Sequence, residues 1–131
     1  MQPQPSSLDS DRRNAYRIAI PATMHLPPML LNDETGPQRA HLLDISRHGA
    51  SVLLNGSIGA AAGGTTLCLI RLFGQRVLAD AEIRSSVTRQ GHLRLGLMFT
   101  ALAPEYRQGL DHSVAVLQRN LLRDYPHARI L

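Results

Sequence analysis

Lysine and tryptophan are absent from this chain of 131 residues, and cysteine and aromatic residues are scarce. Because there is no lysine, all 14 basic residues are arginines. The planar guanidinium of arginine can contact a phosphate or the edge of a base through two hydrogen bonds at once. A GC-rich genome would favour arginine codons as well, so both explanations stay open. In either case the formal net charge of +4 suits an anionic partner.

The shortage of aromatic residues, 4% of the chain, excludes one class of small basic protein. Small barrels that bind RNA or single-stranded DNA stack the bases on aromatic platforms. The aromatic residues here are Tyr16, Phe73, Phe99, Tyr106 and Tyr125, and two of them are expected in the core. The platform is therefore missing, and we do not expect a nucleic-acid partner. Leucine, valine, isoleucine and alanine must fill the core.

The single cysteine, Cys68, excludes an intramolecular disulfide. It lies in an apolar stretch and is expected to be a small core residue, a use that fits a reducing cytoplasm. Residues 1–7 contain no apolar stretch of the kind found in signal peptides. No apolar run approaches the roughly 18 residues of a membrane-spanning helix. The sequence therefore predicts a cytoplasmic protein without membrane insertion.

Sequence patterns of catalysis are also missing. There is no G-x-S-x-G, no H-E-x-x-H, no Walker loop and no evident nucleophile with a base. The glycine-rich stretch 56–64 has no lysine and does not open a helix, so it is not typical of a phosphate cradle. The histidines outside position 48 show no metal-ligand spacing. We expect no enzyme, no metal and no cofactor.

The hydropathy pattern predicts a mainly β protein with one helix at its end. Alternating apolar residues predict strands from Arg17 through Ala22, then at 39–45, 50–54, 65–72, 76–84 and 92–99. Turns are predicted at 32–37, 73–75 and 90–91. About six or seven short strands with tight turns favour a small antiparallel barrel. From Pro104 the period becomes that of an amphipathic helix.

This pattern sets the expected organisation of the chain. Residues 1–11 are polar and contain proline, which predicts an arm that is disordered when free. The domain is expected at 12–123, with the barrel at about 17–100 and the helix at about 104–123. A tail follows at 124–131.

Two short motifs carry the chemistry. One is R-x-x-x-R, formed by Arg13 and Arg17 with Arg12 directly before it; the other is D-x-S-x-x-G, formed by Asp44, Ser46 and Gly49. Guanidinium groups suit phosphates and the acceptor edge of guanine, whereas a carboxylate and a hydroxyl can accept from its donor edge. Glycine allows a turn and the close approach of a base. Taken alone, the arginines could be a solvated arm, and Asp44 and Ser46 could be turn formers bonded to their own backbone.

Together the motifs resemble the signature of the PilZ family, bacterial receptors for cyclic di-GMP. The resemblance runs from about Asp11 to Arg123: residues 50–54 look like the strand after the second motif, and residues 95–99 like the last barrel strand. It implies a Greek-key barrel with its helix beside one opening. It assigns to cyclic di-GMP the residues Arg12, Arg13, Arg17, Asp44, Ser46 and Gly49. Between them, Arg47 is a candidate phosphate contact, and His48 is expected as a turn residue near the ligand.

Arg12 bears on how many ligands bind. In the family, an arginine directly before R-x-x-x-R goes with a stacked, intercalated pair of cyclic di-GMP molecules, and a bulky apolar residue goes with one. A third guanidinium can meet the extra phosphates and guanine edge. We therefore expect two molecules per chain; the alternative is a solvated Arg12.

Three functions compete. The first is a cyclic di-GMP receptor whose arm becomes ordered on binding and which signals in trans to an unidentified effector protein. The second is a PilZ-like adaptor that works by protein contact alone, against which the intact motifs count. The third, a barrel that binds nucleic acid, lacks its aromatic platform. The oligomeric state stays open, since the helix could cap its own barrel or pack on a copy.

Overall fold

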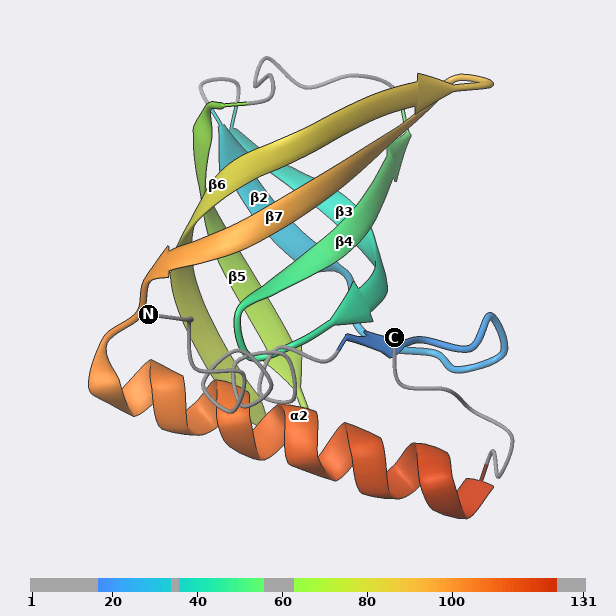
Figure 1. The fold of residues 1–131 in the computed structure, drawn as a ribbon, viewed down its shortest axis with the longest axis vertical. Coiled ribbons are helices and arrows are strands. Elements are labelled where there is room, and N and C mark those ends of the chain that lie inside the picture. The colour runs from blue at the N-terminus through green and yellow to red at the C-terminus, as the bar shows by residue number, and fades with distance from the viewer. Residues whose placement is uncertain (1–16, 34–35, 56–62, 125–131) are drawn as a thin grey trace, which may run out of the picture.

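The structure of the protein is a computed structural model that describes residues 17–33, 36–55 and 63–124 (Figure 1). The strands in these ranges are β1 (Ile18–Ala19), β2 (Met29–Asp33), β3 (Gly36–Ile45), β4 (Gly49–Asn55), β5 (Thr65–Leu72), β6 (Gln75–Arg89) and β7 (His92–Ala101). They are followed by the helix α2 (Pro104–Asp124). The predicted arm at 1–11, the predicted loop residues 56–62 and the tail after Asp124 lie outside the described residues.

Six strands close into an antiparallel barrel. Their order around it is β3, β2, β5, β6, β7 and β4, and β4 pairs back with β3 to complete the circle (Figure 1). The short β1 adds to β3, with Ile18 opposite Ile45. The predicted six- to seven-stranded antiparallel barrel with a C-terminal helix is thus confirmed.

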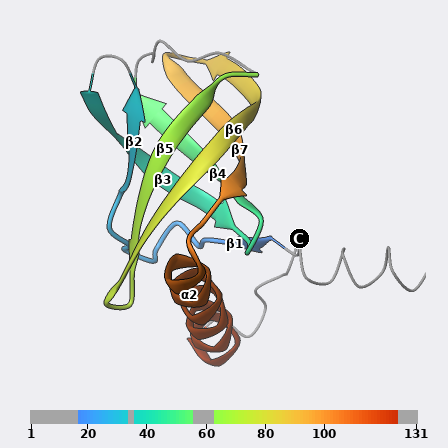
Figure 2. The same ribbon diagram turned by 90° about the vertical axis from the view of Figure 1, so that its left-hand side faces the viewer.

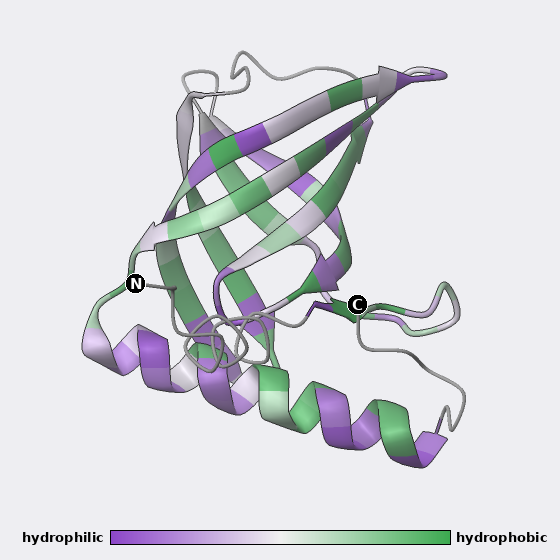
Figure 3. Ribbon diagram, viewed as in Figure 1, coloured by the Kyte–Doolittle hydropathy of each residue, from purple (hydrophilic) through white to green (hydrophobic). Residues whose placement is uncertain are grey.

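Aliphatic side chains fill the barrel, as the scarcity of aromatic residues requires. Hydrophobic and hydrophilic residues alternate along the strands (Figure 3). In β6, where alternation predicted a strand, every second residue is buried: Val77, Ala79, Ala81 and Ile83. Phe99 is the aromatic member of this core. Cys68 is completely buried, as predicted. Burial, with a smaller contribution from the charge of Asp80, raises the pKa of its thiol to about 12.

Two tight turns join β5 to β6 and β6 to β7. Phe73 and Gly74 have φ of 50° and 78°, and Gln90 and Gly91 have φ of 53° and 78°. Two central residues with positive φ characterise the type I′ turn, whose twist matches that of the strands it joins. Both predicted turns are confirmed. However, β6 continues to Arg89 instead of ending near Arg84, so β6 and β7 run together as a long ribbon (Figure 1).

The first strand is shorter than the sequence predicted, whereas β3 begins earlier. Alternation predicted a strand from Arg17 through Ala22, but β1 ends at Ala19. Pro21 cannot donate a ladder hydrogen bond, and its carbonyl instead accepts one from the N–H of Met24 at 3.0 Å, which bends the chain. The turn predicted at 32–37 is also shorter, because Asp33 and Gly36 still pair.

The helix α2 lies across one opening of the barrel (Figures 1 and 2). Its buried residues are Gly109, Leu110, Ser113, Leu117 and Leu121. At Gly109 the helix comes close to the β5–β6 turn: a Cβ there would lie 3.1 Å from Oε1 of Gln75. Nearby, the hydroxyl of Ser113 donates to the carbonyls of Gly109 at 2.8 Å and Leu72 at 3.4 Å. The helix thus caps its own barrel. No helix in the described ranges combines the length and the apolar character that crossing a membrane requires.

Candidate ligand-binding site

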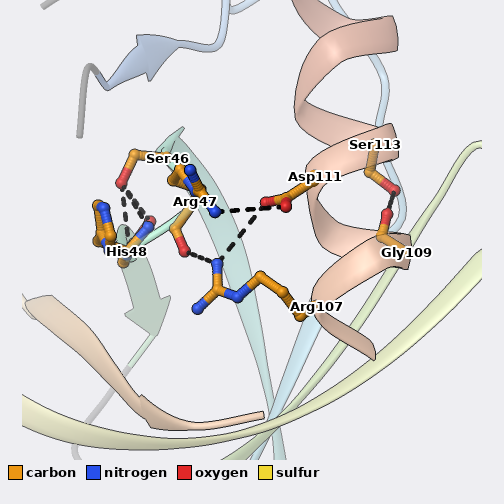
Figure 4. Close-up of polar contacts among 8 residues, drawn as sticks. Ser46, Arg47, His48, Arg107, Gly109, Asp111 and Ser113 are labelled. Atoms are coloured by element: carbon orange, nitrogen blue, oxygen red, sulfur yellow. Dashed lines mark hydrogen bonds and ion pairs between the residues drawn. The ribbon is translucent and has the colours of Figure 1, made fainter. Parts of the chain in front are cut away.

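The D-x-S-x-x-G motif forms the connection between β3 and β4. The N–H of Ser46 donates to the carbonyl of Gly49 at 2.8 Å. The hydroxyl oxygen of Ser46 accepts the N–H groups of His48 at 3.1 Å and Gly49 at 3.2 Å (Figure 4). Ser46 is 2% exposed. Its hydroxyl therefore stabilises the turn, which is the structural role that the sequence had left open as an alternative.

Asp44 reaches the outer face of the barrel through a β-bulge. Leu42 pairs with Val52, but the next pair is Asp44 with Ser51, so Leu43 is an extra residue in β3. Without the bulge, Asp44 would share the inward face with Leu42. Its Oδ1 accepts the N–H of Ser51 at 3.1 Å, and the residue is only 4% exposed. Among the described residues nothing donates to Oδ2, which is therefore the oxygen left for a further donor.

Gly49 allows two strands to approach closely. A Cβ at this position would lie 2.1 Å from the carbonyl oxygen of Leu97 on β7, a distance that no side chain tolerates. Its φ is not in the left-handed region. The need for glycine here thus comes from the backbone of β7, where the sequence had suggested a turn and the approach of a base.

Residues of both motifs surround one cavity of about 290 Å³ on the outer face of the barrel, which we call the motif hollow. One wall is formed by Arg17 of the first motif and by Ser46, His48 and Gly49 of the second. Arg17 is exposed, and its Nη1 donates to the hydroxyl of Ser51 at 3.4 Å. Asp44 lies beside Ser51 without lining the hollow. Arg12 and Arg13 lie outside the described residues.

The opposite wall contains Arg84, which the sequence did not single out. Ile83 pairs with Leu97 and Ser85 with Gly96, so Arg84 is the extra residue of a second bulge. Its guanidinium donates to the sulfur of Met98 at 3.1 Å and lies 3.5 Å from Glu82. The signal for this bulge was the polar Ser85 at a position where strict alternation calls for an inward apolar residue.

Gly96 explains why the two walls can be close. A Cβ on Gly96 would lie 2.4 Å from the hydroxyl oxygen of Ser85. Gly96 therefore allows close packing next to the bulge of β6. Small residues thus form the floor of the motif hollow, and Arg17 and Arg84 bring positive charge to it. No carboxylate lines it within the described ranges.

Arg47 points away from the motif hollow, toward the helix. Its Nη2 lies 3.4 Å from Oδ2 of Asp111 on α2, and its carbonyl accepts a hydrogen bond from Arg107 (Figure 4). Arg107 in turn lies 3.7 Å from Oδ1 of Asp111. In this arrangement Arg47 connects the motif turn to the helix, whereas the sequence had offered it as a phosphate contact.

Residues 11–115 match the family model of the PilZ domain. The chain belongs to the PilZ domain family. The family match includes both motifs, all described strands and the first half of α2. No curated protein sequence matches this PilZ domain significantly.

Solved structures show the same fold. The PilZ domain of YcgR from Escherichia coli, determined with c-di-GMP, is 21% identical with a TM-score of 0.69, over 89% of this chain and 99% of that one. The inhibitor of motility MotI/DgrA from Bacillus subtilis is 17% identical with a TM-score of 0.63, over 92% of this chain and 53% of that one. A longer YcgR structure from Escherichia coli, also in complex with c-di-GMP, is 22% identical with a TM-score of 0.64. The alignment covers 90% of this chain and 51% of that one. This PilZ domain thus spans about half the length of MotI/DgrA and of the longer YcgR chain.

The geometry of this PilZ domain suits an anionic ligand with hydrogen-bond donors. Two guanidinium groups, one from each wall, face a hollow that has a glycine-rich floor. Next to it a nearly buried carboxylate, that of Asp44, keeps one oxygen for a donor. No cluster of His, Cys, Asp or Glu that could hold a metal ion occurs among the residues that the structure describes.

Proposed function

We propose that this PilZ domain is a receptor for cyclic di-GMP and that the motif hollow is the centre of its binding site. One observation carries the proposal: Arg17 of R-x-x-x-R lies at the same hollow as Ser46, His48 and Gly49 of D-x-S-x-x-G, although the motifs are far apart in sequence. The PilZ domain of YcgR, whose structure holds c-di-GMP, supports it through the common fold.

The chemistry of the ligand matches the side chains. Cyclic di-GMP carries two phosphates and two guanines. Arg13 and Arg17 bind the phosphates and the O6 and N7 acceptors of guanine, which the fork of arginine matches. Oδ2 of Asp44 accepts from the guanine donor edge, and Ser46, whose hydroxyl oxygen already accepts two backbone N–H groups, holds the turn at the ligand. Arg84, from the bulge in β6, adds a cation on the opposite side.

The finer parts of the proposal concern Arg12 and the arm. Arg12 meets a second, intercalated molecule, so that two ligands bind per chain. Binding orders the arm at residues 1–11 against the domain at 12–123, and the ordered arm is the surface that an effector protein in trans would recognise. An Arg12→Leu variant should keep the first binding event and shift the stoichiometry toward one.

Isothermal titration calorimetry tests the site. Cyclic di-GMP should bind, and cyclic di-AMP should compete poorly, because adenine lacks the donors that Asp44 accepts from. GTP and GMP should also compete poorly, because each carries one guanine where the dinucleotide carries two. Arg13→Ala, Arg17→Ala and Asp44→Ala should each weaken binding, the arginine variants by about 2–4 kcal/mol, as when one partner of a desolvated charged pair is removed.

Arg71→Ala is the matched control, since it removes an exposed arginine from β5, a strand that does not line the motif hollow. Its affinity should equal that of the unmodified protein. Unchanged affinity in all three site variants would overturn the site. Absence of any binding by the unmodified protein would favour the adaptor that works by protein contact alone.

A further inference from the structure

The outer face of β2, β5 and β6 carries a row of leucines. Leu30, Leu69 and Leu78 pair directly across the three strands, and we call them the leucine row. Leu67 lies beside it on the same face of β5. Leu67 is 40% exposed and Leu78 is 38% exposed, whereas Leu30 and Leu69 are half-buried. Apolar side chains that are grouped on one exposed face of a sheet are typical of a contact surface, unlike ones scattered singly.

Charges of opposite sign lie on the two sides of the leucine row. On one side Arg71 and Arg76 are directly opposite each other on β5 and β6, and on the other side Asp80 is opposite Leu67. All three charged residues are exposed. Among the described residues, none of their side chains has an ion-pair or hydrogen-bond partner. Two arginines directly opposite each other repel, so a carboxylate brought to them from outside would stabilise this face.

Asp80 cannot supply that carboxylate within its own chain. Arg76 and Asp80 lie two residues before and two residues after Leu78 in β6. Four residues of extended strand place their Cα atoms about 13 Å apart, with the leucine row between them. The pair therefore needs a second molecule.

The face is complementary to a second copy of itself. A two-fold axis along the leucine row places each leucine against the same leucine of the other copy and reverses the direction of the strands. Since Arg76 and Asp80 are equally far from Leu78, Arg76 of each copy then meets Asp80 of the other. The same carboxylate is one strand away from Arg71. Such a contact, in which one patch binds itself, is the isologous interface of two-fold symmetric dimers.

We propose that the leucine row and the charges beside it form the interface of a two-fold symmetric dimer of this chain. A second copy suits the face because it supplies both charges at the spacing required. A specific interface usually contains about 20–30 residues a side, many more than this face has, so the dimer is weak and its population depends on concentration. None of these residues lines the motif hollow, and the dimer is therefore independent of the receptor function proposed above.

Analytical ultracentrifugation at micromolar to millimolar protein concentrations tests the dimer. The mean mass should rise from 14.4 kDa toward twice that value. Leu78→Asp should weaken the association by on the order of tenfold or more, because it replaces an apolar contact at the axis by two carboxylates that face each other. Val87→Asp and Leu122→Asp are the matched controls. They make the same change at exposed apolar residues outside this face, and both should associate like the unmodified protein.

Exchanging the charges tests the symmetry itself. Arg76→Asp and Asp80→Arg should each associate poorly, because each variant places like charges against each other on both sides of the leucine row. Mixed in equal amounts, the two variants should form a dimer of about the unmodified affinity, since every charge then faces its opposite. Thermal unfolding verifies that each variant is folded.

Three results would overturn the proposal. One is an unmodified protein that stays monomeric at every concentration, which would leave the leucine row as a surface for a different protein. Another is association that Leu122→Asp abolishes and Leu78→Asp does not, which would place the contact on α2. The third is a mixture of the two charge variants that stays monomeric although the unmodified protein associates.

Discussion

At the scale of single residues, Gly49 and Gly96 both leave too little room for a Cβ, but they should respond differently to substitution by alanine. In Gly49→Ala the new methyl group would meet the carbonyl oxygen of Leu97 at 2.1 Å, and a backbone group inside a closed barrel cannot move aside. We expect the free energy of unfolding to fall by about 3 kcal/mol or more, the upper range of overpacking. Urea denaturation measures it.

Gly96→Ala is the comparison. Its methyl group would meet the hydroxyl oxygen of Ser85 at 2.4 Å, but the Cβ of that serine lies 3.6 Å away, so a rotation about χ1 relieves the contact. The free energy of unfolding should therefore fall by about 1 kcal/mol. Equal losses in both variants would contradict the view that only Gly49 faces an immovable backbone.

The candidate site was predictable only where a side chain acts as its chemistry suggests. Arg17, Ser46, His48 and Gly49 were singled out from the sequence, and the structure gathers them at one hollow. The sequence could not show that these groups already make hydrogen bonds to the backbone. The hydroxyl oxygen of Ser46, for example, accepts hydrogen bonds from two backbone N–H groups. Arg84 was missed because it belongs to neither motif: alternation places it on the outer face but does not show that the strand pairing brings it to the motif hollow. A period-two pattern also does not register the bulge, which changes the direction of the side chains from Ser85 onward.

At the scale of elements, the helix is attached to the motif turn by the ion pair of Asp111 with Arg47 and by the hydrogen bond that Arg107 donates to the carbonyl of Arg47. The side chains of Arg47 and Asp111 are 37% and 40% exposed, so solvent weakens this pair. Asp111→Asn should lower the free energy of unfolding by about 1 kcal/mol or less. The backbone amides of residues 46–49 should nevertheless exchange faster, because their turn loses its ion pair with the helix and keeps only the hydrogen bond from Arg107.

The matched control is Asp124→Asn. It removes the same charge from the last residue of α2, where the carboxylate pairs with its neighbour Arg123 at 3.0 Å. Exchange at the motif turn should not change in this variant. Hydrogen exchange read by NMR separates the two cases, and equal acceleration in both variants would argue against a local connection.

The N-terminal arm is the element that a ligand should affect most. The sequence predicts a disordered arm at residues 1–11, directly before Arg12 and Arg13, and Arg17 lies at the motif hollow. A dinucleotide held by all three arginines must bring the arm against the barrel. Hydrogen exchange by mass spectrometry should show slower exchange at residues 12–17 with cyclic di-GMP and little change inside the barrel. An arm equally protected in both states would contradict this.

The order and type of the elements followed from the sequence, but their ends did not. The 65–72 strand and the 104–123 helix were predicted almost to the residue, because a glycine-rich stretch and Pro104 mark where they begin. The extension of β6 to Arg89 was not predicted: beyond the bulge at Arg84, inward positions are taken by polar residues. Pairing with β7 maintains the strand there, and this is a tertiary effect.

At the scale of the whole molecule, Cys68 reports on the closure of the barrel. It is completely buried, and the pKa of its thiol is raised to about 12. Only the thiolate attacks a disulfide reagent. At pH 8 the native protein should therefore react far more slowly than the unfolded chain, and at a rate that rises with urea in step with global unfolding. Rapid reaction of the native protein would show a barrel that opens locally.

The same thiol determines whether alkaline pH raises or lowers the free energy of unfolding. Its pKa is raised in the folded state from a reference value of 9.0, so the unfolded chain loses this proton first as the pH rises. The contribution of this thiol to the free energy of unfolding is thus constant below pH 9.0 and declines from there toward pH of about 12. Cys68→Ala should remove that part of the decline in denaturation curves measured across this range.

The barrel closes by joining two meanders, β2–β3–β4 and β5–β6–β7, through the pairs β2–β5 and β4–β7. Within each meander the strands are neighbours in sequence and can form early, whereas the two joining pairs require distant segments to meet, which is the slow step for such topologies. The motif hollow lies over the β4–β7 seam, with Ser46 and Gly49 on one side and Arg84 and Met98 on the other. A ligand seated there touches both halves of the chain, so it would hold the last-formed seam shut and lengthen the lifetime of the folded state.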